Sequence, residues 1–109
     1  MKITCLRDLA DPALAPLLVF KVGSALLVGK DGTPRRDWLE TLTDEIAEAR
    51  GRGQKVLVVS SGSIALGAAR LGLPRGGRGS LAEAQAAAAV GQIELGSLWA
   101  GLLGNHDIT

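Results

Sequence analysis

The chain is 109 residues long, which is the length of one domain or of a part of one. Its hydrophobic fraction of 47% and charged fraction of 21% are typical of a globular protein and exclude a disordered tail. Twelve Lys and Arg against eleven Asp and Glu leave a net charge of +1, which gives no electrostatic basis for binding nucleic acid or an anionic membrane. Cys5 and His106 are the only residues of their types, so an internal disulfide and a His/Cys metal cluster are excluded.

The first part of the chain predicts neither a membrane span nor a signal peptide. Its longest apolar run, 13–20, contains Pro16 and is too short to cross a membrane. No small-residue cleavage site accompanies this run. Residues 1–16 carry mixed signals and are expected to form a loose lead-in. We therefore expect a soluble, cytoplasmic protein.

The next segments predict a strand, a helix and a second strand. Residues 17–22 form a nearly continuous apolar run, as expected of a strand buried on both faces of a parallel sheet. After a turn cluster at 29–34, a helix is expected with Asp37 as its cap, ending near 51–53. Residues 56–59 are the clearest strand. Strand, helix and strand in this order predict an α/β fold with a parallel βαβ core and flanking helices.

The remaining residues predict two further helices. The first is expected at 64–71, directly after a Ser-Ser-Gly-Ser turn, and the second at 80–103, with Ser80 and Glu83 as a capping box. The small residues in the middle of the second helix predict close packing against another helix. A flexible, basic loop is expected at 74–79 between them, and 108–109 read as the entry to another strand.

Two strand ends are candidate ligand sites, because ligands of open α/β sheets bind beyond the carboxyl ends of the strands. Lys21 lies in an apolar strand and must reach solvent or an anion, since burying it unpaired is costly. Gly23 lets backbone N–H groups approach a phosphate, and Ser24 follows it. The alternative is an ordinary lysine that extends into solvent from an edge strand.

The second candidate is the turn that contains Ser61, Gly62 and Ser63. It opens a helix, so free N–H groups and the positive end of the helix dipole favour a carboxylate or a phosphate there. The alternative is a simple helix cap by Ser61 or Ser63. Arg75 and Arg78 are interpreted either as solvated loop residues or as contacts to an anionic substrate.

Several catalytic motifs are absent from the sequence. The glycines at 62 and 67 have P-loop spacing, but two alanines replace the Lys-Ser/Thr pair that the motif requires. No Gly-x-Gly-x-x-Gly follows a strand, and no Gly-x-Ser-x-Gly elbow is present. His106 is interpreted as a solvated surface residue and Cys5 as an idle thiol.

Four sequence blocks resemble the amino acid kinase family, and in particular its glutamate kinases. They are Phe20–Leu27, Val58–Gly67, Leu71–Pro74 and Gln85–Gln92. The first block is shared broadly across the family, whereas the second and the last look specific to the glutamate kinases. The likeness spans about residues 17–109, with 1–16 as a lead-in, and corresponds to the first part of the family's kinase domain.

The resemblance implies ATP-dependent phosphorylation of the side-chain carboxylate of L-glutamate, the first step of proline synthesis, with Mg²⁺ as cofactor. It makes Lys21 the catalytic lysine that contacts the ATP phosphates, together with Gly23 and Ser24. It assigns Ser61, Gly62 and Ser63 to glutamate, although the family usually has alanine where Ser63 stands. It implies no metal ligand in this segment and a homo-oligomer for the full-length protein.

The resemblance also implies that 1–109 is an incomplete kinase domain, because the family's later glutamate-binding residues, its second catalytic lysine and its nucleotide-binding half have no counterpart here. Two other hypotheses stay open. One is a non-catalytic remnant that acts as an interaction module, and the other is a different member of the family that acts on another carboxylate or phosphate.

Overall fold

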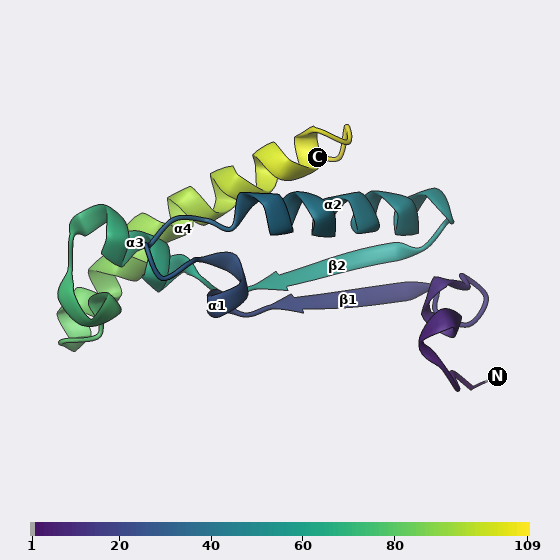
Figure 1. Cartoon of the computed structure of the whole chain (residues 1–109), viewed down its shortest axis with the longest axis horizontal. Helices are drawn as coiled ribbons and strands as arrows, with labels where there is room; N and C mark the ends of the chain where they lie inside the picture. The colour runs from purple at the N-terminus through teal and green to yellow at the C-terminus, as the bar shows by residue number, and fades with distance from the viewer. Residues whose placement is uncertain (1) are drawn as a thin grey trace.

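The structure is a computed structural model that describes residues 2–109. It confirms the predicted α/β class (Figure 1). In chain order the elements are the 3₁₀ helix η1 (Leu6–Ala10), strand β1 (Leu17–Val22), helices α1 (Ser24–Leu27) and α2 (Arg36–Gly51), strand β2 (Lys55–Ser60), helix α3 (Ser63–Leu71), the 3₁₀ helix η2 (Pro74–Gly77) and helix α4 (Leu81–Gly104).

The two strands are parallel neighbours, as the sequence predicts, and α1 and α2 connect them. The register places Leu17 opposite Lys55 and Val22 opposite Ser60. At the carboxyl end the Ser61 N–H donates to the Val22 carbonyl oxygen at 2.8 Å, so the pairing continues past the last strand residues. Both arrows in Figure 1 therefore end side by side, where the chain turns into α1 and α3.

The sheet is covered on one face only. Val22 is buried, whereas Leu17, Val19, Leu57 and Val59 keep 47–56% of their surface exposed. The prediction that β1 is buried on both faces is thus wrong for residues 2–109. The apolar run is continuous in sequence, but the helices in this part of the chain pack against alternate residues only.

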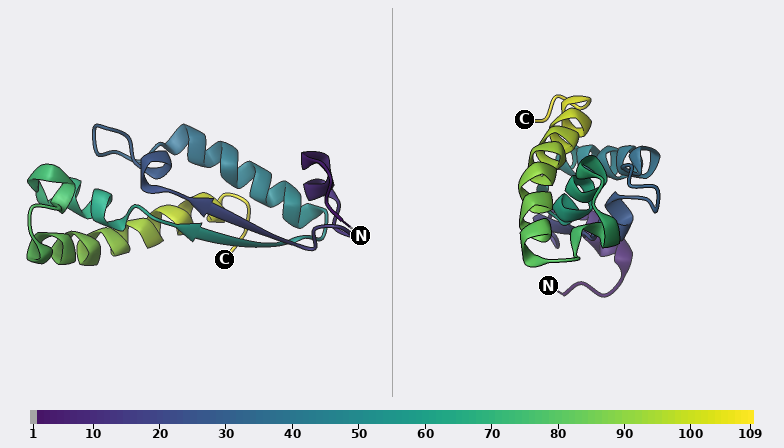
Figure 2. Two further views of the ribbon diagram at one scale, coloured as in Figure 1. Left: turned by 90° about the horizontal axis from the view of Figure 1, so that it is seen from below. Right: turned by 90° about the vertical axis from the view of Figure 1, so that its left-hand side faces the viewer.

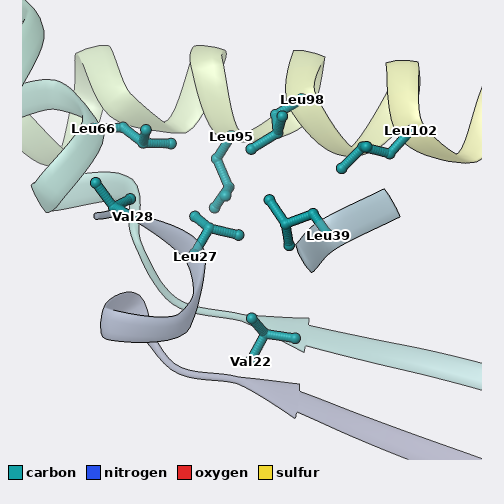
Figure 3. Close-up of a cluster of buried hydrophobic side chains, with 8 residues drawn as sticks. All are labelled: Val22, Leu27, Val28, Leu39, Leu66, Leu95, Leu98 and Leu102. Atoms are coloured by element: carbon teal, nitrogen blue, oxygen red, sulfur yellow. The ribbon is translucent and has the colours of Figure 1, made fainter. Parts of the chain in front are cut away.

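The core lies where the carboxyl ends of the strands meet the helices (Figure 3). Val22 of β1, Leu27 of α1 and Leu39 of α2 face leucines of α3 and α4 across it. Leu27 and Leu39 are completely buried. Burying one such side chain contributes about 1.5–3 kcal/mol, so this cluster fixes the positions of α1 and α3 at the strand ends.

Helices α3 and α4 pack side by side (Figure 2) and approach very closely. A Cβ atom at Gly67 would overlap the backbone of Ala87, and one at Gly91 would overlap the carbonyl oxygen of Ser63. The close helix packing that was expected from the small residues of 86–91 is confirmed. It anchors the first turn of α3.

The lead-in is more ordered than the sequence predicts. The buried Gln54 side chain donates from Nε2 to the carbonyl oxygens of Leu9 and Ala15, both at 2.7 Å. Within the lead-in, the backbone N–H of Thr4 donates to Asp8 at 2.8 Å and holds the pKa of that carboxyl below its usual value. The expectation of a loose segment was wrong because its anchor, Gln54, lies far away in the sequence.

Two predicted helix caps differ from the structure. Helix α2 begins at Arg36 with Arg35 as the N-cap residue, so Asp37 is not the cap. It lies in the first turn instead, where its charge still favours the helix dipole. In α4, Ser80 Oγ accepts from the Glu83 N–H at 3.1 Å, but Glu83 Oε2 is buried without a hydrogen-bond partner, so only half of the predicted capping box forms.

The carboxyl end of the chain forms no strand at 108–109, contrary to expectation. The Ile108 N–H donates instead to the Leu103 carbonyl oxygen at 3.1 Å, which folds the segment back onto the end of α4. In the described part of the chain, α4 is the one helix that is long and apolar enough to cross a membrane, a criterion that core helices of soluble proteins also meet. Its Leu95, Leu98 and Leu102 lie in the core.

Candidate functional site

The two turns predicted as ligand sites lie next to each other. Gly23 follows β1 and is the N-cap residue of α1, and Gly62 follows β2 and is the N-cap residue of α3. The bond from the Ser61 N–H to the Val22 carbonyl oxygen holds the two turns together. The carboxyl edge of the sheet therefore carries both, as the parallel pairing requires.

A pocket of about 430 Å³ opens between these turns and η2. Four predicted site residues line it, namely Ser24, Ser61, Gly62 and Ser63. The other lining residues are Ile64 and Ala65 of α3 together with Arg75, Gly76 and Arg78. The structure thus brings the predicted substrate turn together with one residue of the predicted ATP turn.

Lys21 and Gly23 are not among the residues that line this pocket. Lys21 is exposed, lies opposite Val59 in the register, and shares the uncovered face of the sheet with Val19. No carboxylate lies within 4.0 Å of its ammonium group in residues 2–109. Next to Gly23, the position that a Cβ would occupy has no atom within 4 Å. The strand end therefore leaves open space beside the turn.

Gly62 is required by two features of the turn. Its φ is +115°, a left-handed conformation that glycine adopts readily and other residues rarely do. A Cβ atom there would also collide with the Leu27 side chain. Leu27 of α1 therefore packs directly against the turn that opens α3, so the short helix after the first predicted ligand turn contacts the second turn.

The serines of the second turn do not cap α3. Gly62 is the N-cap residue and no side-chain cap hydrogen bond forms, so the alternative that Ser61 or Ser63 acts as the cap is wrong. The first intrahelical bond at this end runs from the Leu66 N–H to the Gly62 carbonyl oxygen at 3.0 Å. The N–H groups of Ser63, Ile64 and Ala65 precede it, and these residues line the pocket.

The pocket is chemically suited to an anion. No Asp or Glu is among its lining residues, whereas it has two arginines, three serines and the start of a helix. Residues 2–109 hold no cluster of three or more His, Cys, Asp or Glu side chains. No carboxylate lines this pocket, so the pocket itself is poorly suited to Mg²⁺, which prefers carboxylate oxygens.

Sequence reasoning left Arg75 and Arg78 unassigned. They lie in 74–79, which was expected to be a flexible loop; Pro74–Gly77 form η2, a kinked turn in which Arg75 and Gly76 have left-handed φ values of +54° and +61°. The one sequence signal for their position was the pair of glycines between them. Gly77 is buried, and its burial sets where the two neighbouring arginines lie. The structure places both arginines beside the Ser61–Ser63 turn.

The sequence pattern of the Amino acid kinase family matches residues 16–109. The chain belongs to this family. Among its relatives, a glutamate 5-kinase from Novosphingobium aromaticivorans is 63% identical over the entire chain. Glutamate 5-kinases from Sphingopyxis alaskensis and Zymomonas mobilis are 57% and 59% identical over 94% and 85% of the chain.

The chain spans only part of the length of these relatives. It covers 29% of the Novosphingobium amino acid kinase, 28% of the Sphingopyxis protein and 23% of the Zymomonas protein. The likeness to the Novosphingobium relative covers the entire chain, so it includes both strand-end turns and the α3–α4 pair.

Proposed function

We propose that this chain forms part of the active site of a glutamate 5-kinase, which phosphorylates the side-chain carboxylate of L-glutamate with ATP. The observation that carries the proposal is the anion-binding character of the Ser61–Ser63 pocket in a chain that is 63% identical to a glutamate 5-kinase. In this reaction a carboxylate oxygen attacks the γ-phosphorus, a new P–O bond forms, and the bond from the γ-phosphorus to the bridging oxygen breaks to release ADP.

The ATP phosphates are assigned to the turn after β1. The Lys21 ammonium group offsets the negative charge of the transferring phosphoryl group, and Gly23 and Ser24 offer backbone N–H groups from the adjacent turn. The exposed position of Lys21 at the carboxyl end of β1 and the open space beside Gly23 support this role.

The glutamate substrate is assigned to the turn after β2. Ser61, Gly62 and Ser63 line the pocket at the start of α3, where unpaired N–H groups favour a carboxylate. Ser63 is the first residue of α3 and is among the residues that line the pocket. The reaction belongs to proline biosynthesis in the cytoplasm, and the full-length protein is proposed to form a homo-oligomer and to use Mg²⁺ bound outside this segment.

A second candidate function is a non-catalytic interaction module. The observation that favours it is the uncovered sheet face, where Leu17, Val19, Leu57 and Val59 are about half exposed. Exposed apolar surface of this kind is typical of a face that binds another polypeptide.

A hybrid protein tests the kinase proposal. In this hybrid the present chain replaces the matching 29% of the Novosphingobium relative. We expect ADP release that depends on L-glutamate, measured in a coupled assay, and little release with L-aspartate as the control substrate. If the hybrid folds but releases no ADP in the presence of glutamate, the result would favour the interaction module instead.

A further inference from the structure

The η2 segment is fixed in place over the start of α3. Gly77 is buried, and a Cβ there would lie 3.1 Å from the Cβ atoms of both Ala68 and Ala87 and 3.6 Å from Ile64 Cγ2. The Leu73 N–H also donates to the Ala68 carbonyl oxygen at 2.9 Å, just before η2. Arg75 and Arg78 on either side of Gly77 are therefore held beside the substrate turn.

The two guanidinium groups have no acidic partner. The salt bridges in residues 2–109 join Arg70 to Glu94 and His106 to Asp44, and neither Arg75 nor Arg78 lies within 4.0 Å of a carboxylate. Both line the pocket that also contains Ser61 and Ser63. Both side chains are exposed, so an anionic ligand that enters the pocket can accept charge-assisted hydrogen bonds from guanidinium groups that no carboxylate of residues 2–109 occupies.

We propose that Arg75 and Arg78 bind the α-carboxylate of the amino-acid substrate and so select for it. This inference rests on the proposed function and adds to it the chemical group of the substrate that Arg75 and Arg78 recognise. A guanidinium group can bind both oxygens of a carboxylate at once, which suits a carboxylate that is bound but does not react. The side-chain carboxylate must keep one oxygen free to attack phosphorus, so it is the poorer partner for such binding.

The same two arginines could instead bind the phosphates of ATP. The following experiment distinguishes binding of the α-carboxylate from binding of the phosphates. In the hybrid protein, Arg75→Gln and Arg78→Gln remove the charge but keep a long polar side chain. Arg75→Lys and Arg78→Lys keep the charge, and Arg7→Ala in the lead-in is the control because Arg7 is exposed and is not part of the pocket. Binding of L-glutamate, of its α-amide L-isoglutamine and of ATP is measured by calorimetry.

We expect each glutamine variant to weaken L-glutamate binding by about ten- to a hundred-fold, the usual cost of losing a hydrogen bond to a charged group. ATP binding should stay within about two-fold, and the lysine variants should regain part of the lost affinity. Binding of L-isoglutamine should change little, because its α-carboxylate is already an amide. A structural role would instead weaken both amino acids equally.

Three outcomes overturn the inference. They are unchanged glutamate binding in both glutamine variants, a loss confined to ATP, and a wild-type hybrid that binds no glutamate. Calorimetry measures binding without turnover, so its result does not depend on kinase activity. A hybrid that binds glutamate through these arginines but releases no ADP would contradict the proposed kinase activity and would still support the inference.

Discussion

At the scale of single residues, Lys21 offers the sharpest test of the ATP turn. Replacing Lys21 with alanine in the hybrid protein should lower kcat by about 10²–10³, because one charge that stabilises the transferring phosphoryl group is lost. Lys55→Ala is the matched control, since Lys55 is also exposed on β2 but lies at the opposite end of the sheet, across from Leu17. Steady-state kinetics on both variants measures the effect. Near-normal kcat in Lys21→Ala would remove this residue from the catalytic role.

Ser61 offers the corresponding test of the substrate turn. Ser61→Ala should raise the KM for glutamate more than the KM for ATP, because the Ser61 side chain lines the pocket and does not cap α3. Titration of each substrate at saturating levels of the other measures the two constants. Ser97→Ala, an exposed serine of α4, is the control and should change neither. An equal rise of both constants would mean that Ser61 serves only the shape of the turn.

The sequence predicted the site residues from local patterns, and it therefore missed what depends on distant contacts. It placed Ser24 and Ser61–Ser63 correctly at neighbouring strand ends, because parallel strands bring their carboxyl ends together. It did not predict that Leu27 packs against Gly62, since this contact joins residues from two different turns. The position of Arg75 and Arg78 depends likewise on the packing of Gly77 between α3 and α4.

At the scale of elements, the α3–α4 pair depends on two glycines. Gly91→Ala should destabilise the protein by more than about 2 kcal/mol, because the new methyl group would overlap the Ser63 carbonyl oxygen and force the helices apart. Gly96→Ala is the matched control in the same helix. It is exposed and has no atom within 4 Å of the added methyl group, so it should stabilise α4 by about 0.5–1 kcal/mol.

Urea unfolding of both variants, followed by circular dichroism, measures these changes. Equal midpoints for Gly91→Ala and the wild type would show that α3 and α4 are not in close contact in solution. The substitution should also weaken glutamate binding, since the Ser63 carbonyl belongs to the turn that we propose to bind glutamate.

The positions of the elements were largely predictable from the sequence, whereas their ends and their burial were not. Apolar runs and turn residues predict strands at 17–22 and 56–59 and a helix at 64–71, and the structure has these elements at Leu17–Val22, Lys55–Ser60 and Ser63–Leu71. The start of α2 was misplaced because Asp37 has the ideal chemistry for a cap but the helix already begins at Arg36. The one-sided burial of β1 depends on which helices are present, which a local pattern does not contain.

At the scale of the whole molecule, residues 2–109 form an elongated body of 48 × 28 × 20 Å. Its radius of gyration is 16.2 Å, against about 13 Å for a compact domain of this length. Together with the uncovered sheet face, this shape leaves apolar surface in water. We expect the 109-residue chain alone to be marginally stable, to self-associate, and to release no ADP with glutamate, because phosphoryl transfer needs groups that position Mg²⁺ and the nucleotide, and the chain spans only 29% of its Novosphingobium relative.

Size-exclusion chromatography and a coupled assay on the 109-residue chain test this expectation. Val19→Lys with Val59→Lys should shift the protein toward the monomer, because the two lysines place charges on the uncovered face. Trp38→Lys is the control, since Trp38 is also an exposed apolar residue but lies at the start of α2, away from the strands. A stable monomer with glutamate-dependent ADP release would contradict the expectation.

The anchoring of the lead-in by Gln54 has a practical consequence for spectroscopy. Because Gln54 holds Leu9 and Ala15, the described part of the lead-in, from residue 2, lies at the amino end of the sheet, away from the pocket (Figure 1). Cys5 lies there, is exposed, and is the only thiol of the chain. The six residues of β1 put about 20 Å between that end and the ligand turns. A fluorophore on Cys5 would therefore report on the assembly of the protein with other chains without entering the pocket and without any engineered cysteine.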